Sequence, residues 1–114
     1  MDKLRDELRA FVAEREWNKF HTPKNLAMAL SVEASELAEI FQWLTAEESR
    51  TLAPHKLEAV RDEIGDVLLY LVRLADELGV DPLEAARFKL GKNREKYPAN
   101  IVRGKALKYD EYQK

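Results

Sequence analysis

The 114-residue chain contains no cysteine, which excludes a disulfide framework and any metal site built on thiolates. Glycine and proline are also scarce, with four of each. The chain has no phosphate-binding P-loop, dinucleotide fingerprint or nucleophile motif. No stretch approaches the roughly 18 apolar residues of a membrane span, and the start of the chain lacks the apolar core of a secretion signal. We therefore expect a soluble cytoplasmic protein that does not bind membranes.

Apolar residues recur at helical spacing through most of the chain, and no alternating strand pattern is present. The pattern predicts four helices, over about residues 2–16, 23–44, 55–78 and 82–96. Two long antiparallel helices flanked by shorter ones indicate an all-α, four-helix-bundle-type fold, formed within the chain or across a dimer. We expect one helical domain over residues 1–98, followed by a basic tail over residues 99–114.

Capping residues mark the ends of these predicted helices. The pairs Thr22-Pro23 and Asp81-Pro82 each place an N-cap residue before a proline at the first helical position. Thr45 and Glu48 have the spacing of a capping box, which predicts a short helical turn. Gly79 is placed to end the third helix.

Two pairs of carboxylates lie where the two long helices should bury hydrocarbon. The pairs are Glu33/Glu36 and Glu63/Asp66. Members of such an i, i+3 pair have Cβ atoms roughly 5–6 Å apart. A buried carboxylate costs several kcal/mol unless it is compensated, yet residues 27–45 contain no lysine or arginine. The two pairs together predict a metal site, although each pair alone is also explained by solvated carboxylates paired with cations.

The predicted ligands are all oxygen atoms, because neither of the two histidines, His21 and His55, lies near the acidic pairs. Oxygen ligation favours Mg²⁺, with Mn²⁺ as the alternative, over iron or zinc. Mg²⁺ held by few carboxylates completes its coordination with water and substrate phosphates. Any chemistry should therefore be metal-assisted attack by water.

Aromatic and cationic residues form two further groups. Helical geometry places Trp43 and Tyr70 on the carboxylate side of their helices, where they suit the wall of a pocket and could stack on a base. Lys89, Lys92, Asn93 and Lys96 share one helix face, which is either a phosphate-binding surface or simply a solvated face.

Charge is divided unevenly along the chain. Residues 1–86 carry 10 Lys/Arg against 18 Asp/Glu, a net of −8, while residues 87–114 carry 9 against 3, a net of +6. A metal cage next to a cationic segment suits a metal-complexed polyphosphate. The acidic part argues against nucleic acid as a partner, because acidic residues repel phosphate.

The motifs of residues 15–25, 33–43, 62–71 and 93–98 resemble the all-α nucleoside triphosphate pyrophosphohydrolases of the MazG-like group, in particular the dCTP pyrophosphatase branch. The resemblance spans about residues 8–109. It implies a MazG-like fold assembled as a dimer or a dimer of dimers. It also implies Mg²⁺-dependent hydrolysis of a nucleoside triphosphate, dCTP or a modified pyrimidine, to the monophosphate and pyrophosphate, in a role that clears the nucleotide pool.

The resemblance also implies roles for single residues. The metal ligands would be Glu33, Glu36, Glu63 and Asp66. As the catalytic carboxylates that orient or deprotonate the attacking water we expect Glu36 and Glu63, with Glu33 as the alternative. The nucleoside pocket would be lined by Trp17, His21, Trp43 and Tyr70. Phosphate or sugar would be held by Lys89, Lys92, Asn93, Lys96 and Tyr97. One departure is Val32, which stands where many relatives have an additional glutamate before the first motif.

Two other functions fit the same residues. One is a regulatory protein that binds a metal–nucleotide complex without turnover. The other is a small helical assembly or nucleic-acid-binding module that uses the basic C-terminal part.

Overall fold

The computed structural model describes residues 1–104, and these divide into two compact units, residues 1–80 and residues 81 onward. The first unit contains two 3₁₀ turns and three α-helices. The elements, in chain order, are α1 (Asp2–Glu14), η1 (Asn18–Phe20), α2 (Pro23–Phe41), η2 (Glu48–Arg50) and α3 (Pro54–Glu77). No strand occurs in residues 1–104, so the all-α prediction is confirmed.

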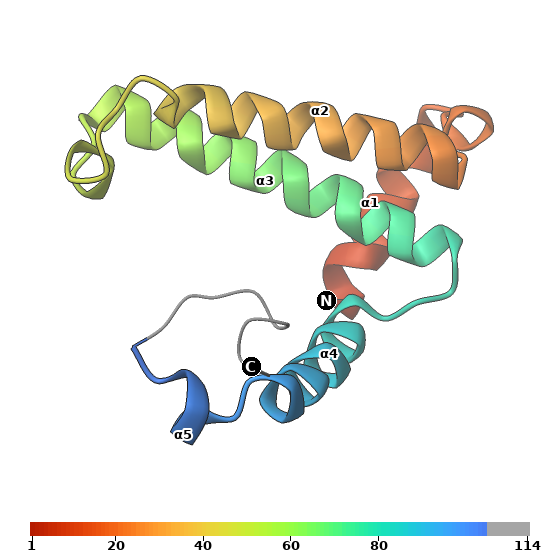
Figure 1. The fold of residues 1–114 in the computed structure, drawn as a ribbon. Coiled ribbons are helices and arrows are strands. Elements are labelled where there is room, and N and C mark those ends of the chain that lie inside the picture. Colours follow the sequence, from red (N-terminus) through yellow and green to blue (C-terminus); the bar gives the residue numbers. More distant parts are fainter. Residues whose placement is uncertain (105–114) are drawn as a thin grey trace. The chain divides into compact units, whose positions relative to one another are not determined.

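The first unit is built on α2 and α3, which lie side by side and run in opposite directions (Figure 1). This confirms the predicted pair of long antiparallel helices. The helix α1 packs on α3. The buried apolar side chains come from all three helices, and they are Val12, Leu26, Val60, Val72 and Ala75. The core is therefore small, and α3, which contacts both other helices, contributes most of it.

A charged contact holds α1 against the end of α3. The guanidinium of Arg9 donates from Nε to Oδ2 of Asp76 at 2.7 Å, and its Nη2 donates to the other carboxylate oxygen. Such a two-pronged bond between a guanidinium and a carboxylate fixes orientation as well as distance. It holds the pKa of Asp76 below its ordinary value, mainly through the hydrogen bonds from Arg9.

The predicted caps are present. Thr22 Oγ1 accepts from the Asn25 amide at 3.2 Å, and Asp81 Oδ1 accepts from the Glu84 amide at 3.0 Å. The capping box also forms, because the Thr45 amide donates to Glu48 Oε1 at 2.8 Å and the Glu48 amide donates to Thr45 Oγ1 at 3.1 Å. These local bonds fix where α2, η2 and the helix that starts at Pro82 begin.

The helices α1 and α3 end in the same way, with a residue of positive φ followed by a paired set of backbone bonds. After α3, Gly79 has a φ of 68°, its amide donates to the Asp76 carbonyl, and the Val80 amide donates to the Ala75 carbonyl. After α1, Glu16 takes this conformation with a φ of 55°. Glycine adopts it without strain, whereas a residue with a Cβ does not.

The second unit contains α4 (Pro82–Lys96) and a short helix, α5 (Ala99–Val102). The helix α5 falls inside the segment predicted as a basic tail, and the rest of that segment, from residue 105, lies outside the described residues. In the part of the chain that the structure describes, none of the helices combines the length and apolar character needed to span a membrane.

Candidate functional site

Three carboxylates from the two long helices meet between α2 and α3. Oxygen atoms of Glu33 and Glu36 on α2 and of Glu63 on α3 all lie within 4.8 Å of one another. They meet because each helix presents its acidic residues toward the other in an antiparallel pair. Asp66, one turn after Glu63, is outside this three-residue group.

The proximity of these side chains shifts their protonation. The pKa of Glu33 is raised above its ordinary value, first by hydrogen bonding with Glu63 that favours the protonated form and then by burial, while a bond with Glu36 opposes the shift. The charge of Asp66 raises it further, so Asp66 lies close enough to act on the cluster. The pKa of Glu36 is also raised, mainly by Glu33. The cluster is thus an accumulation of negative charge.

The cluster fits a divalent cation. Oε2 of Glu33 and Oε2 of Glu63 are buried without a hydrogen-bond partner. None of the ion pairs found in residues 1–104 involves Glu33, Glu36 or Glu63. Buried acceptors without a donor are costly, and hard oxygen ligands are those that Mg²⁺ prefers. The residues present therefore suit a hard divalent metal ion.

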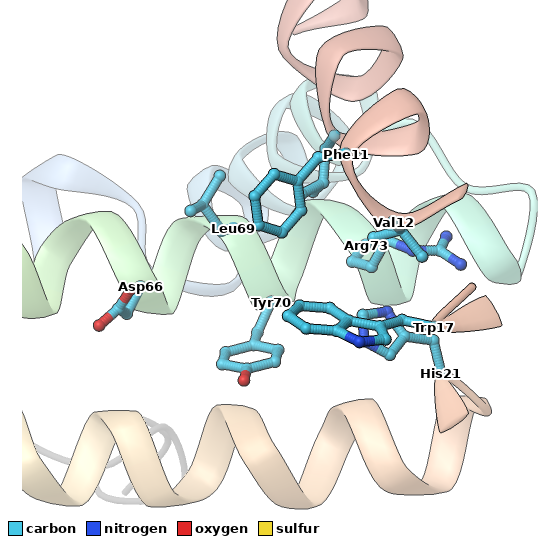
Figure 2. A pocket seen from close by; sticks show the side chains of 9 residues that line it. Phe11, Val12, Trp17, His21, Asp66, Leu69, Tyr70 and Arg73 are labelled. Carbon is cyan, nitrogen blue, oxygen red and sulfur yellow. The ribbon is translucent and has the colours of Figure 1, made fainter. Parts of the chain in front are cut away.

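A cavity of about 200 Å³ adjoins the same stretch of α3. Its lining comes from α1, from the connector that follows it and from α3 (Figure 2). The lining residues are Leu8, Phe11, Val12, Trp17, His21, Asp66, Leu69, Tyr70 and Arg73. Asp66 lies at the end of the cavity away from Trp17 and His21 (Figure 2). Because Asp66 also acts electrostatically on Glu33, it links the cavity to the carboxylate cluster.

The aromatic side chains of the cavity contact one another. Trp17 meets Phe11 edge to face, with ring centroids 5.7 Å apart, and lies 6.4 Å from the His21 ring. The backbone bonds of η1 set this arrangement, because the Phe20 amide donates to the Trp17 carbonyl and the His21 amide to the Asn18 carbonyl. The result is a largely apolar, aromatic-rich wall that suits a planar ring.

A buried arginine at the back of the cavity was not predicted. Arg73 is only 4% exposed, and its Nη2 donates to Asn18 Oδ1 at 3.2 Å and to Glu77 Oε1. Its Nη1 lies 3.6 Å from Asp76 Oδ2. The pKa of His21 is lowered, first by burial and then by the charge of Arg73, while Glu77 opposes this. The i, i+3 and i, i+4 spacing to Asp76 and Glu77 was the available sequence signal.

The structure does not bring every predicted site residue into this region. Trp43 is 87% exposed and does not line the cavity. Helix α2 ends at Phe41, so Trp43 lies beyond the helix on whose geometry its predicted direction depended. Its place in a nucleoside pocket stays a prediction.

The cationic residues lie in the second unit. Lys89, Lys92, Asn93 and Lys96 are on α4, and Tyr97 follows its last residue. The Lys92 ammonium lies 4.5 Å from the centre of the Phe88 ring. The role of this helix in holding phosphate stays a prediction.

Comparison with known proteins identifies the family. The family model described as MazG-like matches residues 28–111. The chain is 45% identical over 101 residues to dCTP pyrophosphatase 1 of Bos taurus, covering 87% of this chain and 60% of that protein. It is 46% identical to dCTP pyrophosphatase 1 of Mus musculus, covering 87% and 59%. The chain thus spans less than two thirds of the length of these curated relatives.

A solved structure supports the same assignment. A crystal structure of a pyrophosphatase from Archaeoglobus fulgidus is 46% identical to this chain and superposes with a TM-score of 0.77, covering 86% of this chain and 92% of that one. The fold and the sequence match agree along most of the described residues, and the family model covers most of the chain. The chain therefore belongs to the MazG-like family.

Proposed function

We propose that this protein hydrolyses a nucleoside triphosphate to the monophosphate and pyrophosphate, with a divalent metal ion held by Glu33, Glu36 and Glu63. The observation that carries the proposal is the cluster of three carboxylates from two helices, two of them with a buried oxygen that has no partner. Relatives named dCTP pyrophosphatase 1 and a solved pyrophosphatase support the reaction class.

The cavity next to the cluster receives the nucleoside. Trp17 and Tyr70 offer ring faces on which a base stacks, and His21 and Asp66 place polar groups at the two ends of the cavity. Asp66 is the fourth acidic residue of the site, where it contacts the metal ion or the substrate. The cavity and the cluster both adjoin α3, which supports a substrate whose base lies in the cavity and whose triphosphate reaches the carboxylates.

Held by Glu33, Glu36 and Glu63, Mg²⁺ or Mn²⁺ would neutralise charge on the triphosphate and would lower the pKa of the attacking water. The chain's own residues orient that water. Glu33 and Glu63 are half-buried and each directs one oxygen inward, whereas Glu36 is exposed. We assign to Glu36 and Glu63 the holding of this water and the acceptance of its proton, and the exposure of Glu36 supports its part in this role.

The base is cytosine, as the relatives' name dCTP pyrophosphatase 1 suggests, or, as a further part of the proposal, a modified pyrimidine. Such an activity clears unwanted nucleotides from the pool.

We further propose that Lys89, Lys92, Asn93, Lys96 and Tyr97 hold phosphate or sugar, and that Trp43 completes a nucleoside pocket. A dimer or dimer of dimers is the assembly in which these residues act.

A panel assay tests the reaction class. The purified protein is incubated with Mg²⁺ and each dNTP and NTP, including 5-modified cytosines, and the products are separated by chromatography. Monophosphate plus pyrophosphate, lost on adding EDTA, is the expected result, with cytosine nucleotides turned over fastest. Diphosphate plus phosphate would refute the proposal, and tight binding without product would instead indicate a regulatory nucleotide-binding protein.

The first prediction concerns Glu63. Replacing it by glutamine (Glu63→Gln) removes one charged ligand while keeping the shape of the side chain, so turnover should fall by about 10²–10³-fold, the range for one preorganised electrostatic group. Steady-state kinetics measures this, and circular dichroism checks that the helices persist. Glu58→Gln, an exposed glutamate on the same helix, is the matched control and should keep normal turnover. Normal turnover in Glu63→Gln would remove this residue from the site.

A further inference from the structure

We propose that Arg73 is a positioning residue of the cavity, which fixes the turn carrying Trp17 and His21 against α3 through its hydrogen bond to Asn18. The inference rests on the proposed function, in which this cavity receives the nucleoside. Arg73 itself does not have to touch the substrate. It acts through the residues that do.

The burial of Arg73 requires an explanation, because a guanidinium is almost never fully buried unless it is paired. Its partners are Asp76 and Glu77 on its own helix and Asn18 in η1. Asp76 is in turn bonded by Arg9 of α1. One buried cation thus ties together α1, η1 and α3, although its partner Asn18 lies 55 positions away in the sequence.

The bond to Asn18 is the contact that reaches the cavity. Asn18 begins the 3₁₀ turn that places Trp17 before it and His21 after it. The helical part of the turn is only three residues long. The backbone bonds of residues 17–21 run within this segment or back to Val12 of α1, and the Asn25 side chain of α2 donates to the Phe20 carbonyl. They shape the turn but do not attach it to α3. The side-chain bond from Arg73 makes that attachment directly under the cavity.

Arg73 also sets the charge around His21. The charged groups that act on the imidazole are Arg73 and Glu77, both from α3. Asp66 and Tyr70 of α3 line the same cavity, and α1 lines it with apolar side chains only, Leu8, Phe11 and Val12. Nδ1 of His21 is buried without a hydrogen-bond partner. Burial is the first cause of the lowered pKa of His21, and the Arg73 cation lowers that pKa further because a nearby positive charge disfavours protonation.

The first test removes the hydrogen bond between Arg73 and Asn18. Asn18→Ala removes the acceptor, and we expect kcat/KM for the best nucleotide of the panel to fall about tenfold, mainly through KM, because a hydrogen bond to a charged group is lost. Asn18→Asp restores an acceptor for Arg73 and should recover most of the loss. Lys19→Ala alters an exposed side chain of the same turn and should leave kcat/KM unchanged. Equal loss in Asn18→Ala and Asn18→Asp would overturn the proposal.

The second test needs no turnover. The chain has two histidines, so the imidazole carbon-bound protons give two NMR titration curves, with His55 at the far end of α3 as internal control. In Arg73→Met the His21 curve should move to higher pH, because the cation is gone and Glu77 remains. In this variant Asp76 retains its hydrogen bonds from Arg9, and Glu77 is partly exposed to solvent. Removing the guanidinium therefore leaves no carboxylate that is both buried and unpaired. Arg61→Met, an exposed arginine of the same helix, is the matched control.

The outcomes of the two tests distinguish this inference from the proposed function. An unchanged His21 curve in Arg73→Met would overturn the electrostatic part, and unchanged KM in Asn18→Ala would overturn the positioning part. If the wild-type protein binds nucleotides but releases no pyrophosphate, the proposed function fails, and the KM comparison is replaced by the dissociation constant for the same nucleotide.

Discussion

Glu33 lies at the centre of the carboxylate cluster, since Glu36 adjoins it on α2 and Glu63 and Asp66 act on it from α3. Without a cation, the like charges repel across the α2–α3 contact. The pKa of Glu33 is raised first by hydrogen bonding with Glu63, then by burial, and further by the charges of Glu63 and Asp66. When the pKa of a group is higher in the folded state than in the unfolded state, the free energy of unfolding decreases as the pH rises through the folded-state pKa.

We therefore predict that, in EDTA, the melting temperature falls as the pH rises from about the ordinary glutamate value of 4.5 toward neutrality. Glu33→Gln should melt at a higher temperature than the wild type at pH 7 in EDTA, because it removes the repulsion. Adding Mg²⁺ or Mn²⁺ should stabilise the wild type by mass action and the variant much less. Scanning fluorimetry with and without metal measures both effects. A lower melting temperature for Glu33→Gln in EDTA would contradict this account.

Two residues show where prediction from the sequence stopped. That Glu33 and Glu36 are neighbours was predictable, because i, i+3 spacing on a helix fixes which side chains adjoin, and the approach of Glu63 followed from the expected antiparallel pair of long helices. Arg73 was not, because its burial depends on Asn18, which only the packed structure brings close. Trp43 was placed with helical geometry although α2 has already ended before it. Helical periodicity predicts the direction of a side chain only within the helix, and Trp43 lies two residues beyond the end of α2.

At the scale of the elements, the starts of the helices were predicted well and the end of α1 was not. Thr22, Thr45, Glu48 and Asp81 bond to amides three residues away, so their contacts follow from the sequence alone. The end of α1 has no glycine, and Glu16 takes the left-handed conformation that Gly79 takes after α3. That conformation costs a residue with a Cβ about 1–2 kcal/mol.

We predict that Glu16→Gly stabilises the protein by about 0.5–1 kcal/mol, because the steric cost of the positive φ is removed while glycine's larger loss of conformational entropy on folding offsets part of that gain. Gly79→Ala should destabilise it by a similar amount. A Cβ at Gly79 meets no atom within 4 Å, so only the backbone conformation changes there. Urea unfolding followed by circular dichroism gives both free energies of unfolding. If both variants moved stability in the same direction, the backbone conformation at these turns would not be the cause.

At the scale of the whole molecule, the first unit leaves many large apolar side chains exposed. Those on the two long helices include Met28, Val32, Leu57, Ile64 and Leu71. Solvent-exposed apolar area of this extent is typical of a surface that another chain covers. A long helix pair with a small core is the kind of unit that completes its core by association. This supports the proposed dimer or dimer of dimers.

We predict that the protein is a dimer or tetramer by light scattering after size exclusion at micromolar concentration. Met28→Asp places a charge in the exposed apolar surface of α2 and should shift the protein toward smaller species. Lys24→Asp, one turn earlier on the same helix and already polar, should not. A monomer at every concentration in the wild type would refute the assembly.

The carboxylate cluster and the cavity share only one element. Helix α2 supplies two of the clustered carboxylates and no residue of the cavity lining, whereas α1 and the connector supply lining and no carboxylate. Only α3 belongs to both. Substitutions at Leu8 or Phe11 can therefore remodel the cavity while the clustered carboxylates stay where they are. The lining of the cavity can therefore change during evolution without moving the carboxylates. Helix α3 is the element least tolerant of substitution, because it contributes to both.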